Sequence, residues 1–404
     1  MISKDSLFEN TIRRDRYNSI IFDKRRRREL YLIGGYLRDL FRGIDSHDRD
    51  YIVRGNLLSF VRDVQKGIGG TIVQFKSNDM MRLVLKDGHT FDFCRFRGTL
   101  EEDLSKRDFT MNALAWSPDS GPIDLYNGIN DIYKGRVCSI SKKNMLDDPL
   151  RMVRAYRFSA ELNGTVDSQT RKTIKFYHKK IRTVSSERIT LEMFYLLNTK
   201  LSSKYLKIAL RDNLLSDILS LSISRLKDNL KVLDAFEKEI LDILPSNIKV
   251  LLHDIFSQNL SYKGLLCLEI LLQDSSGRAN FPHLKMSNKI INRVASAMEG
   301  IRGLNKVKHI NNRRLFEIFM KAGKASVDSL IINNTLTFLK DFRRFQRIWE
   351  NGLLGSDEVM RISGIGPGPK LGKILLALKK AQFEGRLKSK YKAIKFVKSI
   401  DSYA

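Results

Sequence analysis

The spacing of hydrophobic residues divides the chain near residue 148. Before this point, short apolar runs such as Tyr31–Ile33 and Asp50–Val53 alternate with turn residues, which predicts β-strands. After it, Leu and Ile recur every three to four residues, and this spacing predicts helices over 191–197, 205–220, 226–243 and 264–272. We therefore predict an α+β protein, with a small mixed-sheet head followed by a long all-helical neck, body and tail.

Glycines predict two turns in the head. Gly34-Gly35 follows the first predicted strand and indicates a tight turn into a short helix around Leu37–Phe41. Residues Gly70–Phe96 read as a meander of strands, in which Asp87-Gly88 is the signal of a type I′ hairpin turn.

Changes in composition suggest where the chain is divided. Residues 1–28 are polar and end in five consecutive basic residues, which predicts a basic N-terminal arm. The segments that follow are a head (29–140), a helical neck (141–200), a helical body (201–335) and a basic helical tail (336–404).

The charge of the chain points to an anionic partner. Its 404 residues include 72 Lys and Arg against 45 Asp and Glu, a formal net charge of +27. Such an excess is typical of proteins that bind nucleic acid, although a solvated lysine-rich surface would give the same composition. With 42% hydrophobic residues, the chain can bury substantial cores, which argues against disorder.

Several protein classes are excluded by what the sequence lacks. No apolar run approaches the ~20 residues of a membrane span, and the N-terminal residues have no signal-peptide pattern, so we expect a cytoplasmic protein without a membrane partner. Cys94, Cys138 and Cys267 lie far apart with no CxxC pair, which supports neither a disulfide framework nor a cysteine zinc site.

Acidic residues in the head suggest a metal site. Asp48 and Asp50 open the second predicted strand, where residues two apart point the same way, so both carboxylates face one point. Asp92 interrupts another apolar strand and adds a third carboxylate. Such oxygen ligands suit Mg²⁺, and three of them can serve two metals, although Asp-x-Asp pairs also occur as plain turn residues.

A phosphate site is predicted beside these acids. Gly34 and Gly35 allow close approach of an anion to the backbone at a helix N-terminus, and Arg38 adds a charged contact.

An ordered series of motifs resembles one family. Arg107-Asp108-Phe109-Thr110-Met111-Asn112-Ala113 is followed by Asp148-Pro149-Leu150-Arg151-x-x-Arg154 and by ERITLE at residues 187–192. With the Gly-Gly-x-x-Arg-Asp and Asp-x-Asp segments, this series resembles the class II tRNA nucleotidyltransferase and bacterial poly(A) polymerase family over roughly residues 30–195. The segment 353–385 is also similar to the C-terminal region of that family.

The resemblance implies an enzyme that adds CMP or AMP from CTP or ATP to RNA 3′ ends without a template, using Mg²⁺. It implies that Asp48 and Asp50 bind the metals and that Asp92 helps to orient the metal that activates the 3′-hydroxyl. The resemblance further implies a set of nucleotide-binding residues: Gly34, Gly35 and Arg38 at the triphosphate, Arg107, Asp108 and Asn112 at the sugar and phosphates, and Asp148, Arg151 and the neighbouring Arg154 at the base.

Simpler structural roles exist for two of these positions, and a third structural feature is predicted near them. Asp148 before Pro149 is a good helix N-cap, and this role is compatible with base reading. Asp108 can equally cap a helix or pair with a nearby arginine. Arg188 and Glu192 are four residues apart, which predicts a helical ion pair that supports the nucleotide-binding helix.

The sequence does not decide which nucleotides the enzyme adds. Only fourteen residues separate Asp92 from Arg107, a short segment that resembles family members restricted to CC addition. Complete CCA addition and poly(A) synthesis are alternatives, and a non-catalytic RNA-binding protein is an alternative of another class.

Two features of the helical part complete the predictions. His253-Asp254 resembles the centre of an HD phosphohydrolase site, but no suitable second histidine is near in sequence, so we predict an HD-like body without hydrolase activity. In the tail, the glycine-rich segment 363–369 precedes a helix over Leu371–Lys380. We predict that Lys370 and Lys373 contact RNA there, with Lys379 and Lys380 on the same helix, against the alternative of a solvated lysine face.

Overall fold

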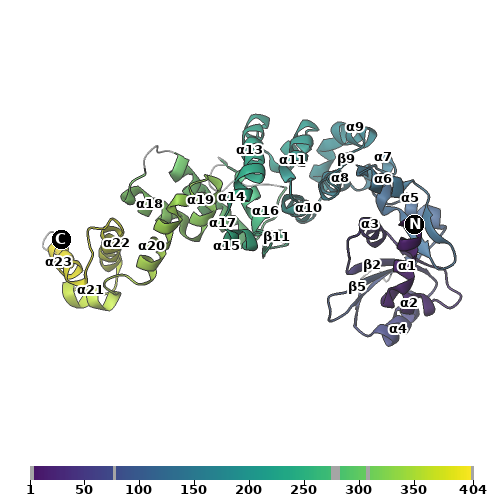
Figure 1. Cartoon of the computed structure of the whole chain (residues 1–404), viewed down its shortest axis with the longest axis horizontal. Helices are drawn as coiled ribbons and strands as arrows, with labels where there is room; N and C mark the ends of the chain where they lie inside the picture. The colour runs from purple at the N-terminus through teal and green to yellow at the C-terminus, as the bar shows by residue number, and fades with distance from the viewer. Residues whose placement is uncertain (1–3, 76–78, 274–282, 306–309, 402–404) are drawn as a thin grey trace. The chain divides into compact units, whose positions relative to one another are not determined.

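The computed structural model describes residues 4–75, 79–273, 283–305 and 310–401 (Figure 1). These residues form two compact units, Met1–Ser220 and Leu221–Ala404. The first unit contains the predicted head and neck and also residues 201–220, because α11 (Ser202–Arg211) packs on α8 (Arg151–Glu161). The division therefore falls later than the seam expected near residue 200.

The head is built on a seven-stranded mixed sheet with the strand order β3-β4-β5-β2-β1-β6-β7. Its strands are β1 (Leu30–Ile33), β2 (Asp48–Arg54), β3 (Thr71–Gln74), β4 (Met80–Val84), β5 (Thr90–Phe96), β6 (Leu114–Ser117) and β7 (Gly121–Asp124). Strands β2 and β5 run parallel, and every other neighbouring pair is antiparallel. Tyr51 and Phe93 from these parallel strands stack in the core. The mixed-sheet head is thus confirmed.

The hairpin between β4 and β5 is present, but its predicted turn type is wrong. Only Gly88 has a positive φ, of 91°, whereas a type I′ turn requires two such residues. The Leu85 N–H donates to the His89 carbonyl at 2.9 Å and the Gly88 N–H to the Leu85 carbonyl at 3.3 Å. The loop therefore has three residues, with glycine in the left-handed position.

The prediction of a basic arm over residues 1–28 is wrong. Residues in this segment form α1 (Lys4–Arg14) and α2 (Arg16–Asp23), and α2 packs against α4 (Leu57–Ile68). Ile12 and Ile21 are fully buried, and the Phe22 ring meets Trp116 edge-on at 5.1 Å. These apolar residues at helical spacing dock the segment on the sheet, while Arg25 pairs with Asp119 at 2.7 Å.

Four further short elements complete the head: α3 (Gly35–Phe41), α5 (Leu100–Ser105), the 3₁₀ turn η1 (Thr110–Asn112) and α6 (Gly128–Tyr133). The turn at Gly34 and the helix after it are as predicted.

The neck is helical, as expected. Its elements are β8 (Arg136–Val137), α7 (Lys142–Asp147), α8, β9 (Thr165–Val166), α9 (Ser168–Tyr177), η2 (His178–Thr183), α10 (Ser186–Asn198), α11 and α12 (Leu214–Leu219). Helices α8 and α10 pack side by side through buried residues such as Tyr156 and Phe194. This packing places the RDFTMNA and ERITLE motifs on either side of α8.

The second unit is almost entirely helical. It comprises α13 (Ile223–Ala235), the π-helix η3 (Phe236–Ile240), α14 (Leu241–Ile243), α15 (Ser246–Leu251), β10 (Ile255–Ser257), β11 (Leu260–Ser261), α16 (Tyr262–Leu271), α17 (Asn288–Asn305), α18 (Asn312–Ala322), η4 (Gly323–Ala325), α19 (Ser326–Ile332), η5 (Leu336–Phe338), α20 (Leu339–Glu350), α21 (Ser356–Ser363), α22 (Pro369–Phe383) and α23 (Lys390–Asp401). One core gathers aromatic rings around Phe316, Phe345 and Phe383, and another lies among α21, α22 and α23.

Two sequence features of the second unit can now be placed. His253 and Asp254 are both exposed after α15. No helix within the described ranges is long and apolar enough to cross a membrane.

Candidate nucleotide-binding and catalytic site

The three predicted metal-site acids lie together at one edge of the sheet. Asp48 and Asp50 are on β2, and the parallel register places Asp50 opposite Asp92 on β5. Asp48 accepts a hydrogen bond from the Thr90 hydroxyl at the start of β5. The register therefore brings Asp50 and Asp92 side by side, with Asp48 at the start of β2, while metal binding by these acids stays a prediction.

Gly34 is required beside these acids. Its φ is +77°, a conformation that other residues rarely adopt. A Cβ added to Gly34 would lie 3.1 Å from Nη1 of Arg107 and 3.4 Å from Oδ2 of Asp50. The turn thus brings together the Gly34 backbone, the Arg107 guanidinium and the Asp50 carboxylate.

Asp50 is in an environment that disfavours its charge. Burial raises the pKa of the Asp50 carboxyl to about 6, with Arg107 lowering it and the carboxylates of Asp92 and Asp48 raising it. A bound cation would offset both the cost of burying the charged Asp50 carboxylate and the repulsion among the three acids.

Asp92 has a cationic partner that was not foreseen. Arg82 on β4 lies opposite Asp92 and donates two hydrogen bonds to its carboxylate, at 2.6 and 2.7 Å. The Arg82 side chain is 41% exposed. Asp92 is thus fixed in place by the neighbouring strand, and its role in orienting a metal stays a prediction.

Asp48 and Asp50 fit a hard divalent cation whose remaining ligands come from the substrate and from water. Within the described residues, no group of three or more His, Cys, Asp or Glu side chains is arranged to hold a metal. The carboxylates of Asp48 and Asp50 are hard oxygen ligands, and such a pair would suit Mg²⁺ bound together with phosphate oxygens and water.

A cavity of about 370 Å³ lies next to this edge. It is lined by residues of the head and neck: Asp103, Lys106, Arg107, Asp108, Asp148, Leu150, Arg151, Arg154 and Arg188. Five cationic side chains against three carboxylates favour an anionic ligand. Arg107 contributes to the cavity and also lies beside Asp50, so it joins the cavity to the acids.

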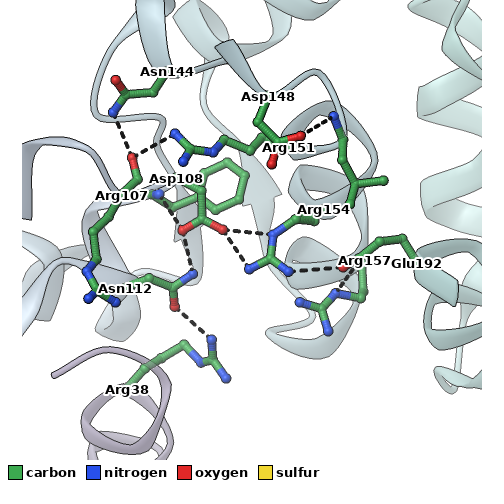
Figure 2. A network of polar contacts seen from close by, with 12 residues as sticks. Arg38, Arg107, Asp108, Asn112, Asn144, Asp148, Arg151, Arg154, Arg157 and Glu192 are labelled. Carbon is green, nitrogen blue, oxygen red and sulfur yellow. Dashed lines mark hydrogen bonds and ion pairs between the residues drawn. The ribbon is translucent and has the colours of Figure 1, made fainter. Parts of the chain in front are cut away.

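A continuous polar network supports the wall of the cavity (Figure 2). Arg38 donates to Asn112 at 2.7 Å, and Asn112 donates to Asp108 at 2.9 Å. The other oxygen of Asp108 pairs with Arg154 at 2.7 Å. Burial acts to raise the pKa of Asp108, but Arg154 and the hydrogen bond from Asn112 outweigh it and lower the pKa below its ordinary value.

The same network extends into the neck through Glu192. Its carboxylate is buried, with one oxygen 3.0 Å from Arg154 and the other 2.8 Å from Arg157 (Figure 2). Of the two structural roles considered for Asp108, pairing with an arginine is confirmed.

The predicted ion pair between Arg188 and Glu192 is wrong. Arg188 instead pairs with Asp148 at 2.9 Å. Glu192 pairs with Arg154 and Arg157 (Figure 2). Four-residue spacing allowed the local pair, but each side chain has a partner across the packed helices, and the buried Glu192 takes two guanidinium groups in place of one.

Asp148 caps the turn before α8 but is not the N-cap of that helix, which is Leu150; it stands at the C-terminal end of α7. Its side chain accepts from the Leu150 N–H at 3.3 Å, and its carbonyl accepts from the Arg151 N–H at 3.1 Å. The assigned helix begins at Arg151, two residues after Pro149. One carboxylate oxygen thus caps the turn and the other meets Arg188, while Asp148 still lines the cavity.

Arg151 connects the neck to the head. Its guanidinium donates to the carbonyls of Lys106 at 2.9 Å and Arg107 at 3.3 Å. Asn144 donates to the Arg107 carbonyl at 2.8 Å (Figure 2). These bonds hold the Arg107 backbone, and therefore its side chain, in place beside Asp50.

The predicted tail contacts belong to the second unit. Lys370 and Lys373 are exposed at the start of α22, which begins with Pro369 after the glycine-rich turn. Lys379 donates to the Trp349 carbonyl at 2.7 Å, and Lys380 pairs with Glu317 at 2.9 Å. The last two lysines therefore join helices together, and RNA contact by Lys370 and Lys373 stays a prediction.

The acids on the parallel strands β2 and β5, beside a cationic cavity, are typical of a nucleotidyltransferase head. Residues 30–138 match the family described as the poly A polymerase head domain. Residues 165–221 match the family described as the probable RNA and SrmB-binding site of polymerase A.

Relatives of known name cover nearly the whole chain. It is 26% identical over 400 residues to a CC-adding tRNA nucleotidyltransferase of Synechocystis sp., covering 91% of this chain and 93% of that protein. The chain is thus similar over nearly its whole length to tRNA nucleotidyltransferases, and its head matches the poly A polymerase head domain.

Solved structures share the fold. The Thermotoga maritima CCA-adding enzyme complexed with tRNA has a TM-score of 0.75 at 18% identity, covering 98% of both chains. The Bacillus stearothermophilus CCA-adding enzyme in complex with CTP has a TM-score of 0.71 at 21% identity, covering 95% of this chain and 97% of that one.

Proposed function

We propose that this protein transfers CMP and/or AMP from CTP or ATP to the 3′-hydroxyl of tRNA without a nucleic-acid template. The observation that carries the proposal is the position of Arg107, which lies beside the Asp48 and Asp50 pair and also lines the cationic cavity. Triphosphate and reacting hydroxyl would meet at this point. The family and the names of the relatives support the same activity.

The chain's own residues would divide the work as follows. Gly34 and Gly35 would let the triphosphate approach the backbone, and Arg38 and Arg107 would offset its charge. Mg²⁺ bound by Asp48 and Asp50 would stabilise the leaving pyrophosphate and activate the 3′-hydroxyl. Asp92, on the neighbouring strand β5, would help to orient the metal that activates the 3′-hydroxyl.

Base selection would depend on Asp148 and Arg151. A carboxylate accepts a hydrogen bond from the amino group that both cytosine and adenine carry, and an arginine donates to a ring nitrogen or carbonyl. UTP has a carbonyl oxygen in place of that amino group, so it would offer the Asp148 carboxylate no hydrogen-bond donor. The buried network from Asp108 through Arg154 would hold this pocket in shape.

The experiment that tests the proposal identifies the product. Purified protein is incubated with CTP and ATP and with tRNA that ends before CCA, and the 3′ ends are sequenced. Addition of CC alone would match the Synechocystis relative's name and the short segment between Asp92 and Arg107. Long A tails on unstructured RNA would instead favour a poly(A) polymerase, and no addition at all would favour a non-catalytic RNA-binding protein.

Replacing Arg188 with Ala is expected to weaken base selection. Without its 2.9 Å partner, the Asp148 carboxylate is free to rotate away from the cavity. Because the pair is partly exposed, we expect a modest effect, about threefold to tenfold in kcat/KM for CTP and ATP, with weaker rejection of UTP. Steady-state kinetics with the three nucleotides measure this. Arg62→Ala, on the exposed face of α4, is the control, and an unchanged UTP ratio in Arg188→Ala would count against the assignment.

A further inference from the structure

The connection between α2 and β1 contains four consecutive arginines, Arg25–Arg28, which we call the arginine turn. A hydrogen bond of 3.0 Å from the Arg28 N–H to the Arg25 carbonyl closes this turn. Inside it, Arg26 has a φ of 55°, in the left-handed region that residues other than glycine adopt at a cost. The chain therefore carries an arginine at a position where glycine would be less strained.

The arginine turn lines a cavity of about 220 Å³. All four arginines contribute to it, together with residues of β1 and of the loop between β6 and β7: Glu29, Leu30, Tyr31, Ser117, Asp119 and Ser120. Consecutive side chains normally point in different directions, either to opposite faces of a strand or around a helix. The tight turn thus gathers four cationic residues around one cavity.

The acids of this cavity are already paired. Asp119 accepts two hydrogen bonds from Arg25, at 2.7 and 2.8 Å. Glu29 accepts one from Arg54 of β2, at 2.8 Å. The other three arginines of the turn form no ion pair with a described residue. Three guanidinium groups near one cavity without a carboxylate favour an anionic ligand.

A buried hydroxyl adds a further donor. Ser117 is only 3% exposed, and its oxygen accepts a hydrogen bond from the Ser120 N–H at 3.1 Å. Within the described residues its O–H donates to no acceptor, so this hydrogen is available to a ligand of the cavity.

The cavity lies at the opposite end of β1 from the catalytic acids. Leu30, at the start of β1, lines the cavity and pairs with Val53, whereas Ile33, at the end of β1, pairs with Asp50. The four residues of this strand span ~13 Å. An anion bound at the arginine turn is therefore not the one that reacts beside Asp50.

We propose that the cavity at the arginine turn binds a small polyphosphate anion such as pyrophosphate, at a site separate from the catalytic one. The planar guanidinium group donates two parallel hydrogen bonds that match a pair of phosphate oxygens, and several arginines can hold neighbouring phosphates. The inference goes beyond the proposed function and does not depend on it, because binding at this site requires neither Mg²⁺ nor RNA.

The lining favours a polyphosphate without a nucleoside. The cavity is smaller than the one next to Asp50, at about 220 Å³ against about 370 Å³. Tyr31 is the aromatic residue among its described lining, and the Tyr31 ring already packs edge-on against Phe96 at 5.9 Å. No ring is thus left to stack on a base, as proteins that bind single-stranded RNA usually do.

Calorimetric titration of the full chain with pyrophosphate, in buffer without Mg²⁺, tests the inference. The parent should bind pyrophosphate at two sites, because the catalytic cavity is cationic as well. Arg107→Gln should weaken the catalytic site alone. The triple variant Arg26→Gln, Arg27→Gln and Arg28→Gln should raise the Kd of the other site at least tenfold and leave the catalytic site unchanged.

Arg26→Gly separates the effect of charge from that of the backbone. It removes one guanidinium group and also relieves the left-handed conformation. We expect the Kd for pyrophosphate at the arginine turn to rise about threefold to tenfold, while the thermal midpoint stays the same or rises. A lower affinity without a loss of stability cannot result from misfolding, so this variant also serves if the triple variant does not fold.

A control variant removes the same charge from the same unit. Arg14→Gln, Arg16→Gln and Arg62→Gln replace three exposed arginines of α1, α2 and α4 that do not line the cavity. This variant should keep both pyrophosphate sites. CTP incorporation at saturating substrate should be unchanged in the Arg26, Arg27 and Arg28 triple variant, because its site lies at the other end of β1.

Three results would overturn the inference. The first is a parent that binds pyrophosphate at the catalytic cavity alone. The second is an equal loss of affinity in the control variant, which would show an effect of overall charge. The third is a triple variant that binds pyrophosphate normally but loses affinity for tRNA, which would make the arginine turn an RNA contact. A parent that binds pyrophosphate at both sites but adds no nucleotide would refute the proposed function alone.

Discussion

Replacing Asp50 with Asn is expected to abolish nucleotide transfer and, at the same time, to stabilise the protein. Activity should fall on the order of 1,000-fold or more, equivalent to about 4 kcal/mol of transition-state stabilisation, because an amide is a much weaker ligand for Mg²⁺ than a carboxylate. Stability should rise because the wild-type carboxylate is buried beside Asp92 and Asp48.

The sign of the stability change follows from proton linkage. The pKa of Asp50 is about 6 in the folded chain against an ordinary value of 3.8. The folded state therefore binds the proton more tightly than the unfolded state, and ionisation of Asp50 reduces stability as pH rises from about 4 to about 6. Asn carries no charge, so the variant should gain about 1–3 kcal/mol above pH 6 and nothing below pH 4.

Thermal unfolding of the metal-free protein at pH 4 and pH 7.5, together with CTP incorporation, measures both effects. Asp45→Asn, at an exposed position just before β2, is the control and should change neither. Added Mg²⁺ should stabilise the parent more than Asp50→Asn. A variant that keeps its turnover, or that is destabilised at pH 7.5, would contradict the assignment of Asp50.

Much of the head was predictable from residue patterns because its determinants are local. Strand alternation and the Asp48-x-Asp50 spacing predicted two acids on one face, and the register places Asp50 opposite Asp92 and Asp48 opposite Thr90. The pairing of Arg82 with Asp92 could also have been predicted from the sequence. A three-residue loop at Lys86–Gly88 sets the register of β4 against β5, and counting back along it places Arg82 opposite Asp92. Treating the loop as a two-residue turn concealed this pair.

The neck was harder to predict because its contacts join residues far apart in sequence. Arg188 and Asp148 are 40 residues apart, and Arg154 and Glu192 are 38 apart. Helical spacing alone favoured the local pair of Arg188 and Glu192. The sequence of one helix does not show which of its faces packs against another helix, so the partners across the packed helices could not be predicted. The N-terminal helices were missed for a different reason, because the basic run at residues 24–28 concealed the apolar positions before it.

Replacing Glu192 with Ala is expected to cause a large loss of stability. Glu192 is buried at 5% relative exposure, and its two oxygens neutralise Arg154 and Arg157. Removing it leaves two largely buried guanidinium groups without their shared partner, and such a loss costs about 3–5 kcal/mol. Arg154 keeps Asp108, whereas among the described residues the carboxylate partner left to Arg157 is Glu161, at 3.4 Å. For a unit of this size the thermal midpoint should fall by about 10 °C.

The consequences should extend to the site, since Arg154 lines the cavity and holds Asp108. In Glu192→Ala we expect a raised KM for CTP and ATP, and faster amide hydrogen exchange in α8 and α10 than in the second unit. Glu192→Gln keeps the shape and one accepting oxygen, so its loss should be about half as large. Glu187→Ala, exposed on the same helix, should change stability by less than about 0.5 kcal/mol. A loss below about 1 kcal/mol in Glu192→Ala would show that the network is dispensable, and the cavity would then owe its shape to the apolar packing of α8 on α10 instead.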